Sequence, residues 1–236
     1  MRERIESWDF LKIATIMLVV WGHLIQYFLP TDQSENPLYC WIYTFHMPLF
    51  MVMSGFFAID GFKRTNVLIY GRQKTKRLLV PALVWCALNY VLSLLTYEGT
   101  ATWMSFFSML VNGLWFLKSL FCCSILGFVA FRCYRQKWKG VVLTLLVSAL
   151  FVKWSVNVMY PCFLFGILIK THFEWIRRNM LKVFWISGAI FIPTSIMASL
   201  FSNIWKFRVE PFMSTPMDTH YTFVILGCRY LTMFIG

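Results

Sequence analysis

The sequence predicts an all-α fold, a polytopic bundle of transmembrane helices. The 236 residues are 59% hydrophobic and only 14% charged, whereas soluble domains carry roughly 25% charged residues. Several apolar stretches also approach the ~20 residues that a helix needs to cross the hydrocarbon of a bilayer. The strands of a membrane barrel would be alternating segments about half as long. Length and composition together therefore favour helices in lipid.

Eight apolar runs predict eight membrane spans within a single transmembrane domain over residues 1–236. Almost no loop separates the fifth run from the sixth, so we expect these two to be tilted or partly re-entrant. Residues 203–218 are the only outer connection that we expect to be long enough to carry structure. The expected spans lie near residues 9–30, 37–59, 77–97, 113–133, 140–156, 157–171, 181–202 and 219–236.

Charge is distributed unequally between the two sides of the predicted bundle. Of the 22 basic residues, 16 fall on one side, and the opposite connections are mainly acidic. By the positive-inside rule the N-terminus is cytoplasmic, as in a multi-pass protein of the bacterial cytoplasmic (inner) membrane. The net charge of +12 then follows from orientation in the membrane, and we expect no nucleic-acid partner. The basic residues of this side are Arg2, Arg4, Lys63, Arg64, Arg72, Lys74, Lys76, Arg77, Arg132, Arg135, Lys137, Lys139, Lys170, Arg177, Arg178 and Lys182.

The end of the chain lacks the flank that a last span should have. Gly236 falls inside an apolar run, with no polar or basic tail after it. An eighth span should be followed by a positively charged cytoplasmic flank. We therefore expect the domain to be truncated at its C-terminus.

The first predicted span contains three ionisable residues, Asp9, Lys12 and His23. Such groups cost on the order of 3 kcal/mol each in hydrocarbon unless they are paired or face water. Asp9 and Lys12 are three residues apart and can pair on one helix face. His23 returns to within about 20° of the face of Lys12, roughly 16 Å further along the helix. We expect both to line one channel at different depths; the alternative is that His23 is a hydrogen-bonding residue between helices.

The second predicted span contains His46, Pro48, Ser54 and Gly55. Pro48 removes a backbone donor, and Ser54 and Gly55 allow close approach between helices, so packing explains them better than catalysis does. His46 is a second imidazole at intermediate depth that could line the same cavity as His23.

The remaining polar residues of the spans point to no metal site. The seven cysteines show no paired ligand spacing, and neither an H-E-x-x-H pair nor a nucleophile elbow is present. We therefore expect no metal and no hydrolase chemistry. Lys153 and Lys118 should lie near the outer ends of their spans and extend their amines to the interface; the alternative is a functional role for these cations.

Five blocks of sequence resemble the integral membrane acyltransferase 3 family, particularly its fucose O-acetylase-like, O-acetyltransferase branch. They occur in the order that the family shows and extend over residues 8–170. The resemblance implies that the protein transfers an acyl group, usually acetyl, to a hydroxyl. The blocks read WDFLKIATIMLVVWGH, YTFHMPLFMVMSGFF, KTKRLLVPALVW, GLWFLKSLF and YPCFLFGILI.

The resemblance also assigns roles to residues. It implies that His23 is catalytic, and the histidine of the family's FHMPLF block corresponds to His46. From their places in the predicted spans, we also expect Asp9, Ser54 and Trp115 to orient the substrates. The donor would be cytoplasmic acyl-CoA, with acetyl-CoA as substrate and no permanently bound cofactor. The acceptor would be a carbohydrate or glycolipid hydroxyl of the cell envelope, such as a polysaccharide precursor. The basic residues that would hold the CoA phosphates by charge-assisted hydrogen bonds are Lys12, Arg72, Lys76 and Arg77.

Two other functions fit the same residues. In a carrier or flippase, His23, His46, Lys12 and Asp9 would form a proton or substrate pathway. The absence of inverted repeats in the sequence argues against the carrier hypothesis. The second alternative is an inactive, truncated homologue.

Overall fold

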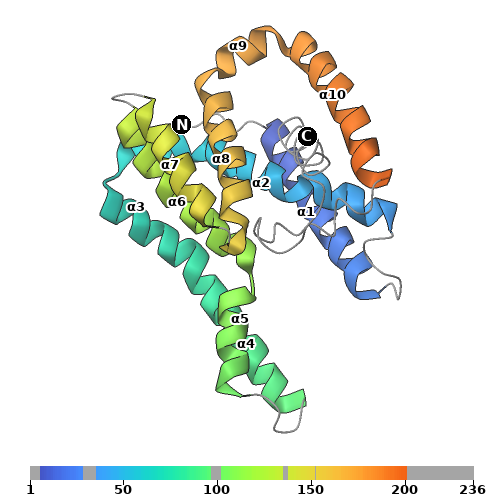
Figure 1. The fold of residues 1–236 in the computed structure, drawn as a ribbon, viewed down its shortest axis with the longest axis vertical. Helices are drawn as coiled ribbons and strands as arrows, with labels where there is room; N and C mark the ends of the chain where they lie inside the picture. The colour runs from blue at the N-terminus through green and yellow to red at the C-terminus, as the bar shows by residue number, and fades with distance from the viewer. Residues whose placement is uncertain (1–5, 29–35, 97–101, 135–137, 152, 201–236) are drawn as a thin grey trace, which may run out of the picture. The chain divides into compact units, whose positions relative to one another are not determined.

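The computed structural model describes residues 6–28, 36–96, 102–134, 138–151 and 153–200, which Figure 1 colours along the chain. Every regular element in these ranges is a helix, which confirms the all-α prediction. The chain forms two compact units, residues 1–53 with 168–236 and residues 54–167, and each is described by itself. The predicted span at 219–236 and the predicted outer loop at 203–218 lie outside the described residues.

In the first unit, helix α1 (Glu6–Phe28) packs against the first half of helix α2 (Pro37–Arg64). Asn36 begins α2 because its side-chain oxygen accepts from the backbone amides of Leu38 and Tyr39 at 3.0 and 3.1 Å. The two helices approach closely at Gly22, where a Cβ atom would lie 2.8 Å from Cε2 of Tyr43. The absence of a side chain at Gly22 therefore leaves room for the Tyr43 ring against α1.

The C-terminal part of the first unit consists of the end of α8 (Val156–Thr171), the short α9 (Phe173–Arg178) and α10 (Met180–Leu200). The rings of Phe45 and Phe191 meet edge to face with centroids 5.6 Å apart, which joins α10 to α2. The predicted spans at 157–171 and 181–202 correspond to α8 and α10. Helix α9 occupies residues that we expected to be a cytoplasmic connection.

The second unit contains a continuous helical stretch that is longer than predicted. Helix α3 (Val67–Lys74), the π-helix η2 (Thr75–Leu79) and helix α4 (Val80–Thr96) follow one another without a break. The span expected at 77–97 therefore begins ten residues earlier, because the Asn66 side chain caps a new helix at Val67. The basic segment before the third span is helical and is not a loop.

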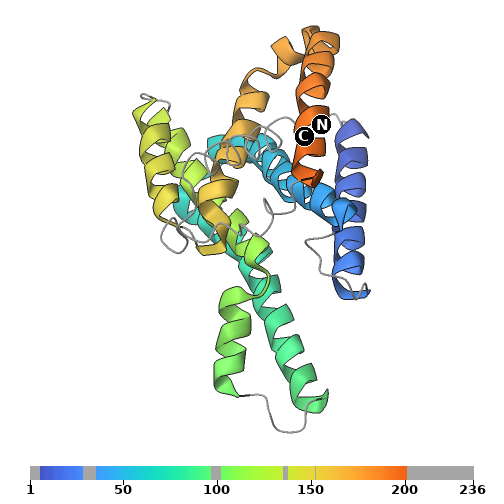
Figure 2. The same cartoon turned by 45° about the vertical axis from the view of Figure 1, so that its right-hand side comes forward.

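Helix α5 (Trp103–Asn112) was not predicted as an element. It lies antiparallel beside α4, as Figure 2 shows, and joins α6 (Trp115–Tyr134) through a bend of 52°. Its apolar run is too short to cross a membrane alone, which is why the sequence suggested a loop. The expectation that only 203–218 could carry structure among the outer connections was therefore wrong.

The remaining helices of the second unit are α7 (Lys139–Leu150) and the first part of α8, joined by the 3₁₀ turn η3 (Lys153–Ser155). Helix α7 packs along α6. Helix α8 crosses α2 closely, because a Cβ on Gly55 would lie 1.9 Å from the carbonyl oxygen of Phe163. The break between the fifth and sixth predicted spans lies at η3, just before Val156, close to the predicted boundary between residues 156 and 157.

Three helices in the described ranges are long and apolar enough to cross a membrane, or four if the bent pair α5 and α6 is one span. Helices α7, α8 and α10 are apolar but shorter over their described parts. These lengths are those of a multi-pass membrane protein. The number of eight spans and the cytoplasmic N-terminus stay predictions.

Candidate active site

His23 is an exposed residue near the end of α1, and its ring is held by a neighbour one turn further on. Its Nδ1 atom lies 3.2 Å from Oε1 of Gln26. The hydroxyl of Tyr43, on α2, donates to the same oxygen at 3.1 Å. The Tyr27 ring stacks beside the imidazole with centroids 6.1 Å apart. Helices α1 and α2 thus position His23 together through Gln26.

His46 is buried in α2, with 1% of its surface exposed. Its Nδ1 atom lies 2.7 Å from the carbonyl oxygen of Ile42. The ring of Tyr43 meets the imidazole edge to face, with centroids 4.6 Å apart. Tyr43 therefore contacts His46 with its ring and reaches Gln26, the partner of His23, with its hydroxyl. The structure brings both predicted histidines to this one tyrosine.

Lys12 and Asp9 form the predicted ion pair, with Nζ and Oδ1 3.4 Å apart and both side chains partly exposed. Helix α1 is unbroken from Glu6 to Phe28. The regular turn of an α-helix then keeps Lys12 on the face of His23, roughly 16 Å away along the axis. The pair carries little net charge, so it is compatible with an interfacial position at the start of the helix.

The predicted phosphate-binding residues lie in the second unit, on the helical stretch that leads into α4. Arg72 is in the last turn of α3, and Lys76 and Arg77 are in the π-helix η2; all three side chains are exposed. Lys74 lies between them, half-buried, with Nζ 5.4 Å from the centroid of the Tyr70 ring. π-Helical turns are rare and often occur at functional sites. The exposed cations form a basic segment that a polyanion could reach.

The two remaining predicted residues also lie in the second unit. Ser54 is half-buried on α2 and directly precedes Gly55, the point of closest approach to α8. Trp115 begins α6 and contacts Phe116 edge to face at 5.9 Å. The close helix approach at Gly55 agrees with the interpretation that Ser54 and Gly55 serve helix packing. The substrate-orienting roles of Ser54, Trp115 and Asp9 stay predictions.

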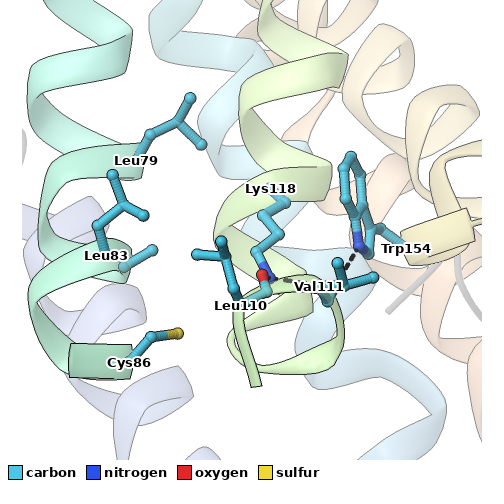
Figure 3. Close-up of a pocket in the computed structure, with 8 residues that line it drawn as sticks. Leu79, Leu83, Cys86, Leu110, Val111, Lys118 and Trp154 are labelled. Carbon is cyan, nitrogen blue, oxygen red and sulfur yellow. Dashed lines mark hydrogen bonds between the residues drawn. The ribbon is translucent and has the colours of Figure 1, made fainter. Parts of the chain in front are cut away.

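Lys118 contradicts its prediction. It does not extend to an interface, because it is only 7% exposed. Its ammonium group donates to the carbonyl oxygens of Leu110 and Gly113, and to that of Val111 at 3.1 Å, at the end of α5 (Figure 3). A helix C-terminus leaves carbonyls unpaired and is partly negative, so a buried cation is stable there. The side chain of Lys153 lies outside the described residues.

Trp154 completes this cap from η3. Its indole Nε1 donates to the Val111 carbonyl at 2.8 Å, and its ring centroid lies 5.8 Å from Nζ of Lys118. Trp154 and Ser155 have φ of 61° and 55°, and Leu114, after the end of α5, has φ of 47°. Such left-handed residues cost roughly 1–3 kcal/mol each and persist where surrounding contacts hold them.

An apolar cavity of about 290 Å³ lies beside this cap, with α4 on its other side (Figure 3). The thiol of Cys86, on the α4 wall, donates to the Met109 carbonyl at 3.5 Å. In the described ranges, no group of three or more His, Cys, Asp or Glu side chains could hold a metal ion. The residues that line the cavity are Leu79, Ala82, Leu83, Cys86, Leu110, Val111, Lys118 and Trp154.

Sequence reasoning missed Gln26 and Tyr43 beside the histidines, and the cap of Lys118 and Trp154. Gln26 lies one helical turn after His23, so the spacing of three residues was available as a signal. Tyr43 comes from another helix, and its contact depends on the packing of α1 against α2. For Lys118, the glycine five residues before it marked the end of a helix whose carbonyls needed partners.

A family model and two curated relatives show which proteins this chain is similar to. A family model described as an acyltransferase domain matches residues 5–236. Nodulation protein NolL of Sinorhizobium fredii (strain NBRC 101917 / NGR234) is 32% identical over 75% of this chain and 51% of its own length. NolL of Mesorhizobium japonicum (strain LMG 29417 / CECT 9101 / MAFF 303099) is 26% identical over 76% of this chain and 52% of its own length.

The chain therefore spans about half the length of these curated relatives. No solved structure matches it. The match of the family model over nearly the whole sequence agrees with the five ordered blocks that resemble acyltransferase 3 proteins. The chain belongs to this family of membrane acyltransferases.

Proposed function

We propose that the protein is an O-acyltransferase of the bacterial cytoplasmic membrane. It moves an acyl group, acetyl in the simplest case, from cytoplasmic acyl-CoA to a hydroxyl of a cell-envelope sugar or polysaccharide precursor. The observation that carries the proposal is the imidazole of His23, which is held at one nitrogen by Gln26 at 3.2 Å. Membership of the acyltransferase family supports the same chemistry.

The proposed reaction uses neutral His23 as a general base. Its unprotonated ring nitrogen takes the proton of the acceptor hydroxyl as that oxygen attacks the carbonyl carbon of the thioester. The new C–O bond forms, the C–S bond breaks, and the departing CoA sulfur receives the proton from the imidazolium. No oxidant, reductant or metal enters the balance. His46, which shares Tyr43 with the His23 partner, would keep the neighbouring part of α2 in place.

The basic segment would hold the donor by its phosphates. Arg72, Lys76 and Arg77 are exposed on consecutive turns, and guanidinium groups bind phosphate through paired, charge-assisted hydrogen bonds. Lys12 would add a cation at the start of α1, although Asp9 already pairs with it at 3.4 Å. Donor binding and proton transfer would thus involve different residues, so mutations can separate them.

The test is transfer of radiolabelled acetyl from acetyl-CoA in membranes that contain the protein. General-base catalysis contributes about 10²- to 10⁴-fold, so His23→Ala should lower the rate by that factor. His172→Ala is the matched control, because His172 is an exposed histidine whose Nδ1 contacts only the local Leu168 carbonyl and Thr171 hydroxyl. Unchanged transfer in a folded His23→Ala protein would contradict the proposed role.

The same assay in detergent separates an enzyme from a carrier. Transport cannot be scored without a membrane, whereas acetyl-CoA-dependent product still forms if the protein is an acyltransferase. Release of free CoA and labelled acceptor by the detergent-purified protein supports the proposal. A purified protein that moves substrate only in sealed vesicles would favour the carrier.

A further inference from the structure

We propose that Gln26 and Tyr43 are positioning residues that keep the proton of neutral His23 on Nδ1 and leave Nε2 as the base. The inference rests on the proposed acyl transfer. It assigns a role to two residues that the family resemblance did not indicate, and it names the nitrogen that reacts.

Oε1 of Gln26 has two neighbours that can donate a hydrogen bond to it. The Tyr43 hydroxyl, which also interacts with the Tyr39 side chain, donates to Oε1 at 3.1 Å, and with this donor the atom is the acceptor end of the amide. The same atom lies 3.2 Å from Nδ1 of His23. A carbonyl oxygen has two lone pairs and can accept both bonds. Nδ1 must then carry a hydrogen, because two acceptors cannot bond to each other.

The second step follows from the chemistry of imidazole. Neutral histidine has one N–H nitrogen and one nitrogen with a lone pair, and the hydrogen bond made by one decides the state of the other. A protonated Nδ1 therefore leaves the lone pair on Nε2. Within the described part of the chain, the Nδ1 bond to Gln26 and the Tyr27 stack hold the ring of His23, and His46 is close enough to interact with it electrostatically. Nε2 is on the opposite side of the ring from Gln26, on an exposed residue.

The third step is the placement of Tyr43 itself. Its ring passes beside Gly22, where a Cβ would lie 2.8 Å from Cε2. It stacks on Tyr39 at 4.1 Å and meets His46 edge to face at 4.6 Å. The buried His46 is in turn held by the Ile42 carbonyl at 2.7 Å. The hydroxyl of Tyr43 is thus aimed at Gln26 by contacts on three sides of its ring.

In the proposed step, Nε2 removes the proton of the acceptor hydroxyl, and positive charge develops on the imidazole. The Nδ1–H bond to Gln26 then strengthens, because the donor becomes cationic. The proton later passes from Nε2 to the departing CoA sulfur, and His23 returns to its Nδ1–H form. Gln26 neither gains nor loses a proton, so Glu or Gln can serve at this position but an apolar residue cannot.

The experiment measures the tautomer directly by ¹⁵N NMR of the full chain with labelled histidine. The His23 signals are assigned by their loss in His23→Gln. The expected spectrum has a protonated Nδ1 and an unprotonated Nε2 for His23. In Gln26→Leu the two forms should mix, since the acceptor at Nδ1 is gone. A His23 protonated at Nε2 in the unmodified protein, or a tautomer that Gln26→Leu leaves unchanged, overturns the proposal.

Kinetics provides the second measurement. Misplacing a catalytic group by about 1 Å can cost up to ~100-fold in rate. We expect Gln26→Leu and Tyr43→Phe to lower kcat with little change in the KM for acetyl-CoA, and Gln26→Glu to retain most of the activity of the unmodified protein. Equal loss in Gln26→Glu and Gln26→Leu would contradict the role of the acceptor oxygen.

Tyr160→Phe is the matched control for Tyr43→Phe. This substitution also removes one hydroxyl hydrogen bond, the 2.8 Å bond from Tyr160 to Thr144, which lies in the other unit of the chain. A rate lowered equally by both substitutions would indicate a loss of stability and would overturn the positioning role. If the unmodified protein transfers no acetyl group, the proposed acyl transfer fails, while the NMR spectrum still decides which nitrogen of His23 carries the proton.

Discussion

His23 and Lys118 are both ionisable residues in apolar helices, but their surroundings differ. Lys118 is buried, and its ammonium group donates to three backbone carbonyls. His23 is exposed, and one ring nitrogen is held while the other faces away from the partner. A group whose donors are all used stabilises the fold, and a group with one unused nitrogen can do chemistry. Mutation of Lys118 should therefore lower the stability of the fold, and mutation of His23 should lower the rate of acyl transfer.

The largest stability effect should come from Lys118→Met. Methionine fills similar space but leaves the carbonyls of Leu110 and Gly113 without the amine, and an unsatisfied buried polar group costs about 1–3 kcal/mol. We expect the midpoint of thermal unfolding in detergent to fall by roughly 2–12 °C. Lys139→Met removes an exposed lysine at the start of α7 and should leave the midpoint unchanged. Equal unfolding midpoints for both variants would show that the cap of Lys118 contributes little to the stability of the fold.

A second stability prediction concerns two glycines. Gly55→Ala would place a methyl group 1.9 Å from the Phe163 carbonyl, so α2 and α8 must separate, at a cost of about 1–3 kcal/mol. Gly188→Ala is the control, because among the described residues no atom beyond its own stretch of α10 lies within 4 Å of the new Cβ. Alanine in a helix interior is favoured over glycine by roughly 0.5–1 kcal/mol, so this variant should be equally or more stable. Reversed effects on the unfolding midpoint would contradict the packing at Gly55.

The donor-binding prediction separates the basic segment from His23. Replacing Arg72 and Arg77 by Gln should weaken acetyl-CoA binding about thirtyfold or more, with a smaller effect on kcat, because each guanidinium contributes charge-assisted hydrogen bonds worth about 1 kcal/mol or more. Replacing Lys63 and Arg64 removes the same charge from the exposed end of α2 and should have little effect. Binding is measured by titration with acetyl-CoA. An affinity that falls equally in both pairs would indicate a general effect of charge.

The smallest predicted effect is at Gly22. Alanine there would place its Cβ 2.8 Å from Cε2 of the Tyr43 ring, so the far end of this side chain must shift, which costs less than a shift of backbone. We expect the unfolding midpoint to stay nearly constant while kcat falls by a few-fold, since Tyr43 then holds Gln26 less well. A change in the unfolding midpoint without a change in kcat would show that Gly22 contributes to stability and not to catalysis.

The sequence predicted the helices whose apolar runs are long, including α1, α2, α6 and α10. It predicted the Asp9–Lys12 pair as well, because both partners lie on one helix at a spacing of three residues. Such features depend on local periodicity, which is readable without coordinates. Ordered motifs suggested the candidate site residues His23 and His46, and the structure adds which of their atoms are held.

The features that were missed depend on contacts between helices. Helix α5 is too short to be recognised by hydropathy, and Lys118 is buried only because the chain turns back beside it at Gly113. The hydroxyl of Tyr43 reaches Gln26 across the interface between α1 and α2, where Gly22 leaves room for the Tyr43 ring. A π-helix at Thr75–Leu79 has no simple sequence pattern, so the basic segment was expected to be a loop.

The most direct test of the account compares acetyl-CoA binding with acetyl transfer in purified His23→Ala. We expect the dissociation constant for acetyl-CoA and the unfolding midpoint to stay close to those of the unmodified protein. Transfer to the acceptor in a single turnover should fall by about 10²- to 10⁴-fold. Transfer at the unmodified rate by a folded His23→Ala protein would contradict the assignment of His23 as the base.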